Sequence, residues 1–152
     1  MIVQLCRLLI RKYAKGKDPL AYALRYDGGR FDPGTGCFLS ESGHGLTCAT
    51  FVLAVFKSHG VDLLRTDQWR ERDEDKKWQQ WILDELGDAR YATPEHIRAV
   101  EREIKLGCAR FRPQEVAAAG TAETPDALPI SFEDAARLGE LLVDTLLARA
   151  AR

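Results

Sequence analysis

The chain has 152 residues, a length that suits one domain whose core is large enough to fold without disulfide bonds. Hydrophobic residues make up 45% and charged residues 30% of the sequence, which excludes a disordered or fibrous protein. The 22 lysine and arginine residues nearly balance the 23 aspartate and glutamate residues, giving a formal net charge of −1. We therefore expect no nucleic-acid partner, because nucleic-acid-binding proteins usually carry a clear basic excess.

The N-terminus and the cysteines bear on the compartment. The first residues lack the features of a signal peptide, because Arg7 interrupts the apolar run and no small-residue cleavage site follows. No stretch is long and apolar enough to cross a membrane. The four cysteines are widely spaced and form no Cys-x-x-Cys pair. We expect a cytoplasmic protein with free thiols, unless a leader is missing from the sequence.

The first half of the chain predicts one helix and a small sheet. Apolar residues at helical spacing predict an amphipathic helix over 2–14. Residues 20–26 are expected to form a strand, followed by a glycine-rich turn over 27–30 and a return strand from Phe31. A second turn over 32–36 leads to another short strand over 37–39.

The second half predicts helices. Trp78 and Trp81 lie in a helix that ends at Gly87, and further helices are expected over 94–105 and 113–119. Residues 121–130, rich in Ala, Thr and Pro, are expected to form a linker. It separates an α+β domain over 1–120 from a C-terminal helix over 131–152. The buried stripe expected for that last helix consists of Phe132, Ala135, Leu138, Leu141, Leu142, Thr145 and Leu146.

The segment with the clearest chemical signal surrounds Cys48. A glycine-flanked loop precedes Thr47, a suitable N-cap, and an almost wholly apolar helix follows to about residue 58. The N-terminus of a helix carries a partial positive charge, which favours the thiolate form of a cysteine. Cys48 is therefore a candidate nucleophile, although a small buried core residue is the alternative interpretation.

A cysteine nucleophile needs a base or a proton donor nearby. His44 lies four residues before Cys48, and His96 falls in the first turn of its own helix. His59 lies at the opposite end of the Cys48 helix, too far along the axis to reach the thiol. A zinc site formed by Cys37, His44, Cys48 and Cys108 is a further alternative, but the spacing lacks the close ligand pairs of known zinc motifs.

The segment from Leu46 to Leu64 resembles the nucleophile segment of the NlpC-type papain-like cysteine peptidases and amidases. The shared features are a cysteine followed by small residues, an apolar helix, and then a glycine, an aliphatic residue and a leucine. The resemblance implies a papain-like fold with Cys48 as nucleophile. Ordinary members carry a histidine on a strand after the cysteine. His96 also comes after the cysteine, but it is expected on a helix. Permuted relatives carry the histidine on an earlier strand, and residues 20–26 contain none.

These observations lead to one expectation and one alternative. The resemblance implies a cysteine-dependent hydrolase or acyl transferase that acts on an amide, peptide or ester bond, with Cys48, His44 and His96 as candidate catalytic residues. No cofactor is implied. The alternative is a catalytically inactive papain-like module that binds or regulates a protein partner.

Overall fold

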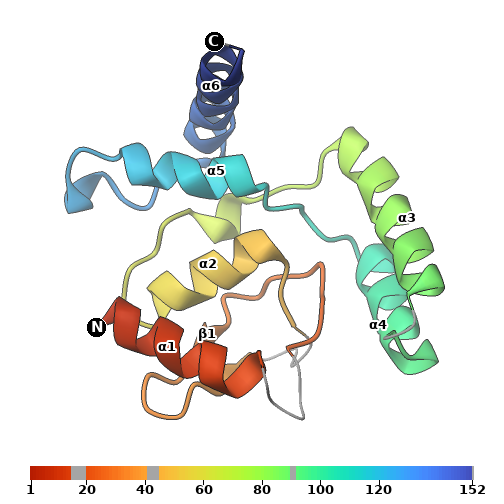
Figure 1. The fold of residues 1–152 in the computed structure, drawn as a ribbon. Helices are drawn as coiled ribbons and strands as arrows, with labels where there is room; N and C mark the ends of the chain where they lie inside the picture. The colour runs from red at the N-terminus through yellow and green to blue at the C-terminus, as the bar shows by residue number, and fades with distance from the viewer. Residues whose placement is uncertain (15–19, 41–44, 90–91, 152) are drawn as a thin grey trace.

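The computed structural model describes residues 1–14, 20–40, 45–89 and 92–151. It is an α+β structure with six helices and a two-stranded sheet among the described residues, and the sheet lies beside α1 and α2 (Figure 1). No helix among these residues is long and apolar enough to cross a bilayer. The helices are α1 (Ile2–Tyr13), α2 (Cys48–Lys57), α3 (Asp73–Asp88), α4 (Pro94–Lys105), α5 (Pro113–Ala118) and α6 (Phe132–Ala150), with single 3₁₀ turns η1 (Thr66–Gln68), η2 (Ala119–Thr121) and η3 (Pro125–Ala127).

The sheet is a short antiparallel hairpin. Strand β1 (Arg30–Phe31) pairs with β2 (Phe38–Leu39). The predicted turn over 32–36 is confirmed: the Asp32 carboxylate accepts hydrogen bonds from the backbone N–H groups of Gly34 and Thr35. These short-range contacts explain why the sequence alone located the hairpin.

The prediction of a strand over 20–26 is wrong. This segment has no regular secondary structure and bends at Leu24, and its backbone groups bond to other elements instead of a neighbouring strand. The Glu103 carboxylate of α4 accepts hydrogen bonds from the N–H groups of Leu24 and Arg25, at 2.8 and 3.3 Å. The carbonyl of Ala21 accepts from the N–H of Leu46. A buried side chain of α4 thus takes the place of a strand partner.

The central element is α2, because its two sides pack into two different hydrophobic clusters. Ala49 and Leu53 contact Phe111, Val116 and other residues of the first cluster. On the other side, Ala54 and Val55 join a second cluster built from α1, β1 and Leu46. A helix that is apolar on nearly every side is stable in water only when other elements cover it on both sides, as they cover α2 here.

Helices α3 and α4 lie side by side, away from α2 (Figure 1). They enclose a third cluster that includes Leu24, Ile82, Leu86, Val100 and Cys108. Leu24 is the contribution of the 20–26 segment to this cluster. Residues 20–26 therefore contact the α3–α4 pair through Leu24. They also contact the chain just before α2, because the Ala21 carbonyl accepts a hydrogen bond from Leu46.

The C-terminal helix packs only by its first half. Phe132, Ala135 and Gly139 of α6 are buried, and an added Cβ at Gly139 would lie 3.2 Å from the backbone of Gln114 in α5. The predicted burial of Leu141 and Leu146 is wrong, since their exposed fractions are 59% and 62%. Helix α5 is too short to cover the second half of α6, which extends beyond it (Figure 1).

Candidate functional site

Cys48 is the first residue of α2, and its side chain is exposed. Thr47 forms the predicted N-cap. Its hydroxyl accepts a hydrogen bond from the N–H of Thr50 at 3.2 Å, and the Thr50 hydroxyl accepts one from the N–H of Thr47 at 2.8 Å. The interpretation of Cys48 as a buried core residue is therefore wrong. The capping box fixes the helix start, so the thiol has a defined position.

The same cap leaves two backbone N–H groups at the N-terminus of α2 without an acceptor in the described parts of the chain. The N–H groups of Thr50 and Phe51 bond to Thr47, whereas those of Cys48 and Ala49 have no acceptor among the residues that the structure describes. The first N–H groups of a helix point outward along its axis and carry the positive end of its dipole. They are suited to stabilise a negatively charged oxygen next to the Cys48 thiol.

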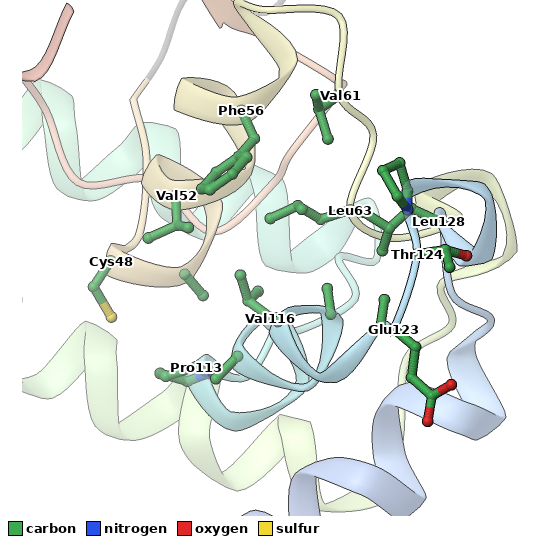
Figure 2. A pocket seen from close by; sticks show the side chains of 16 residues that line it. Cys48, Val52, Phe56, Val61, Leu63, Pro113, Val116, Glu123, Thr124 and Leu128 are labelled. Carbon is green, nitrogen blue, oxygen red and sulfur yellow. The ribbon is translucent and has the colours of Figure 1, made fainter. Parts of the chain in front are cut away.

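A groove with a volume of about 760 Å³ begins at Cys48 (Figure 2). Its volume lies within the range of small-molecule binding sites, roughly 300–1,000 Å³. Cys48 and Pro113 lie at one end, and Glu123, Thr124 and Leu128 lie at the other (Figure 2). The described residues that line it are Cys48, Ala49, Val52, Phe56, Val61, Leu63, Pro113, Val116, Ala117, Ala119, Gly120, Ala122, Glu123, Thr124, Pro125 and Leu128.

Residues 121–130, expected to be a linker, form much of one wall of this groove. The segment is tied to the core because the carbonyl of Leu63 accepts a hydrogen bond from the N–H of Ile130, whose carbonyl accepts one from Arg65. The second wall comes from one side of α2. The groove therefore lies between the helix that carries the thiol and a segment far away in sequence.

Tyr22 lies within electrostatic reach of Cys48. Burial raises the pKa of the Tyr22 phenol, Cys48 raises it further, and Arg110 lowers it. The guanidinium of Arg110 stacks 4.3 Å from the centre of the Trp78 ring. Because its pKa is raised above the usual value of about 10, the Tyr22 phenol stays protonated at neutral pH.

The histidines are placed differently from one another. His96 is half-buried on α4, and its Nε2 lies 2.6 Å from the carbonyl oxygen of Tyr22, which accepts the hydrogen bond. Neither a hydrogen bond nor an ion pair joins His96 to Cys48. His44 lies outside the described residues. The structure therefore brings His96 to the backbone of Tyr22 and not to Cys48.

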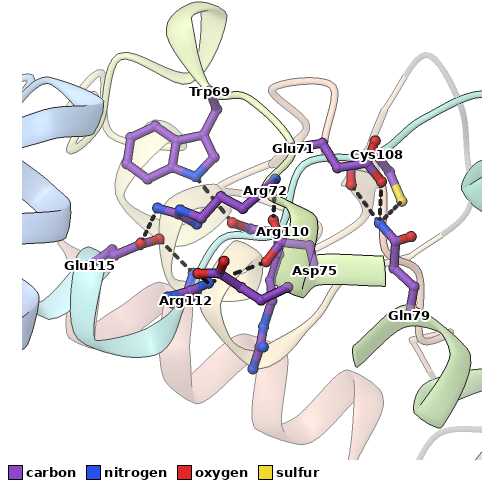
Figure 3. Close-up of polar contacts among 10 residues, drawn as sticks. Trp69, Glu71, Arg72, Asp75, Gln79, Cys108, Arg110, Arg112 and Glu115 are labelled. Carbon is purple, nitrogen blue, oxygen red and sulfur yellow. Dashed lines mark hydrogen bonds and ion pairs between the residues drawn. The ribbon is translucent and has the colours of Figure 1, made fainter. Parts of the chain in front are cut away.

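A buried polar network holds the groove wall in place (Figure 3). Glu115 of α5 pairs with Arg72 and accepts a hydrogen bond from the N–H of Arg112 at 3.0 Å. Arg112 in turn pairs with Glu74 and Asp75 of α3. Glu115 and Asp75 expose only 2% and 0% of their surface. Because buried carboxylates are stable only when paired, this network fixes the start of α5 relative to α3.

The remaining cysteines lie in other environments. Hydrogen bonds from Thr35 and Lys12 lower the pKa of Cys37, whose Sγ is 3.3 Å from the Lys12 Nζ. Burial raises the pKa of Cys108 to about 12. No group of three or more histidine, cysteine, aspartate or glutamate side chains in the described parts of the chain is arranged to hold a metal ion. His44, one member of the suggested zinc set, falls outside those parts.

Comparison of the chain with protein-family models, curated proteins and solved structures finds no match. One feature of the site was not predicted from the sequence: the groove wall from α5 to residue 128. No local sequence pattern predicts this wall, because its position depends on the path of the chain after α5.

Proposed function

We propose that this protein is a cysteine-dependent hydrolase or acyl transferase that acts on an amide, peptide or ester bond through the thiolate of Cys48. The observation that carries the proposal is that the exposed Cys48 thiol stands at the start of α2 and at one end of a groove. Membership of the papain-like group, including its fold, belongs to the same proposal. It is supported by the resemblance of the segment from Leu46 to Leu64.

The geometry supports a two-step reaction. The Cys48 thiolate attacks the carbonyl carbon, and the N–H groups of Cys48 and Ala49 bind the oxygen that becomes negative. His44 or His96 gives a proton to the leaving group. Water or another acceptor then attacks the acyl-cysteine and restores the thiol. The mechanism uses no cofactor.

The test uses p-nitrophenyl acetate, a small activated ester whose reaction releases coloured nitrophenolate. We expect an acetyl group on Cys48, detected by peptide mass spectrometry, and turnover that the Cys48→Ala variant lacks. Cys37→Ala is the matched control, because the lowered pKa of Cys37 makes it a second reactive thiol. Full turnover in Cys48→Ala, or loss of turnover in Cys37→Ala alone, would refute the assignment of the nucleophile.

A second candidate is a papain-like module that binds a protein partner without catalysis. Two observations favour it: the groove is mainly apolar, and no base is hydrogen-bonded to Cys48 among the described residues. The rate of Cys48 alkylation by iodoacetamide separates the candidates. An enzyme thiol should react faster in the folded protein than in urea at the same pH, whereas an exposed thiol without activation should react at about the same rate in both.

A further inference from the structure

The polarity of the groove limits what it can hold. Its floor and walls are apolar side chains from α2, α5 and the segment after it, such as Val52, Phe56 and Val116 (Figure 2). Among the lining residues that the structure describes, Glu123 is the only acidic or basic one, and it lies with Thr124 at the end remote from Cys48. Between the two ends, a bound molecule would meet almost no side-chain hydrogen-bonding group.

This distribution argues against an extended peptide as the main occupant. Every peptide unit carries an N–H and a carbonyl group, and burying them without partners costs roughly 1–3 kcal/mol each. Polar groups are confined to the two ends: the helix start offers N–H donors next to the thiol, and Glu123 and Thr124 lie at the remote end. A molecule with one carbonyl group followed by an apolar chain matches this pattern from Cys48 along the groove.

We propose that the groove binds the hydrocarbon chain of an acyl group, so that the substrate class is an acyl ester or thioester with a medium or long chain. This inference rests on the proposed function of Cys48. The thiolate attacks the carbonyl carbon of the thioester, the carbon–sulfur bond to the leaving thiol breaks, and that thiol departs as a thiolate that takes a proton from solvent. The acyl group is then held as a Cys48 thioester, with its chain along Val52, Phe56 and Val116. Attack by water releases the fatty acid and the Cys48 thiol.

The test measures acylation of Cys48 by the acetyl, hexanoyl and decanoyl thioesters of N-acetylcysteamine, followed by mass spectrometry. Each methylene group that the groove covers should raise the rate by up to about fourfold, since its removal from water is favourable. Val52→Glu places a charge on the groove wall and should lower the ratio of decanoyl to acetyl rates at least tenfold. Val143→Glu on α6 is the matched control, because the exposed fractions of Val52 and Val143 are 38% and 37%.

The outcomes separate this inference from the proposed function. A decanoyl preference that falls in Val52→Glu and persists in Val143→Glu supports an acyl-binding groove. Equal rates for acetyl and decanoyl thioesters overturn the inference and leave Cys48 as a nucleophile. A decanoyl preference unchanged in Val52→Glu also overturns it, because the chain then lies elsewhere. If no thioester acylates Cys48, the proposed function fails and the acyl-binding inference fails with it.

Discussion

Glu103 is the most informative residue to remove, because one buried carboxylate holds the segment that carries Tyr22. Its exposed fraction is 5%, and its Oε2 accepts hydrogen bonds from the N–H groups of Leu24 and Arg25. A hydrogen bond to a charged group contributes about 1.5–3 kcal/mol, and the longer of the two bonds contributes less. After the cost of burying the carboxylate is subtracted, Glu103→Ala should lower the free energy of unfolding by about 2–4 kcal/mol.

The assay is urea unfolding followed by circular dichroism. Glu103→Ala should lower the midpoint while leaving the slope unchanged, since the surface exposed on unfolding stays similar. Glu95→Ala is the control on the same helix: Glu95 is exposed and its ion pair with Arg98 lies at the surface, so the midpoint of this variant should stay close to that of the wild type. If both variants shift the midpoint equally, Glu103 does not hold the 20–26 segment.

Gly45, Cys108 and His96 each give a further prediction. At Gly45, φ is +147° and an added Cβ would lie 2.1 Å from the carbonyl oxygen of Ala21, so Gly45→Ala should lower the free energy of unfolding by more than about 2 kcal/mol. Burial raises the pKa of Cys108 to about 12, so the unfolded chain releases the thiol proton at a lower pH than the folded chain does. The free energy of unfolding should therefore fall between about pH 9 and about pH 12. The fall should be smaller in Cys108→Ala. His96→Ala should lower the urea midpoint by removing the donor to the Tyr22 carbonyl, whereas His96→Gln, which keeps a donor, should restore part of the loss.

Each of these has a contrary result. Wild-type stability in Gly45→Ala would mean that the loop tolerates a side chain there. An identical alkaline decline in Cys108→Ala would assign the pH dependence to other groups, such as Tyr26, whose pKa burial also raises. Equal midpoints for His96→Ala and His96→Gln would show that the contact with Tyr22 contributes no stability.

Local signals in the sequence predicted the helix boundaries well. Thr47 caps the helix that it was expected to cap, and Thr93 and Ser131 cap the helices expected to begin beside them, because capping depends only on a side chain and the next three residues. The same reasoning placed Cys48 at the start of α2. Its exposure could not be predicted, since it depends on which side of the helix the groove leaves open.

Long-range pairing explains what sequence reasoning missed. Residues 20–26 have the composition of a strand, yet Glu103 of α4 supplies the hydrogen-bond acceptor that a neighbouring strand would have given. The apolar residues of α6 continue past the end of α5, so periodicity alone could not reveal that Leu141 and Leu146 are exposed. The path of residues 119–128 beside α2 likewise depends on tertiary contacts.

The pair of helices α3 and α4 has a consequence for motion. It packs around a hydrophobic cluster to which, among the described residues, only Leu24, Cys108 and their neighbours contribute from outside the pair, and polar groups such as Glu103, His96 and the pairs made by Arg112 add to the connection. Such a unit can open as a whole at a free energy below that of global unfolding, with amide hydrogen exchange in α3 and α4 faster than in α2. Opening would release both the backbone of Leu24 and the carbonyl of Tyr22, while the helix that carries the Cys48 thiol stays folded.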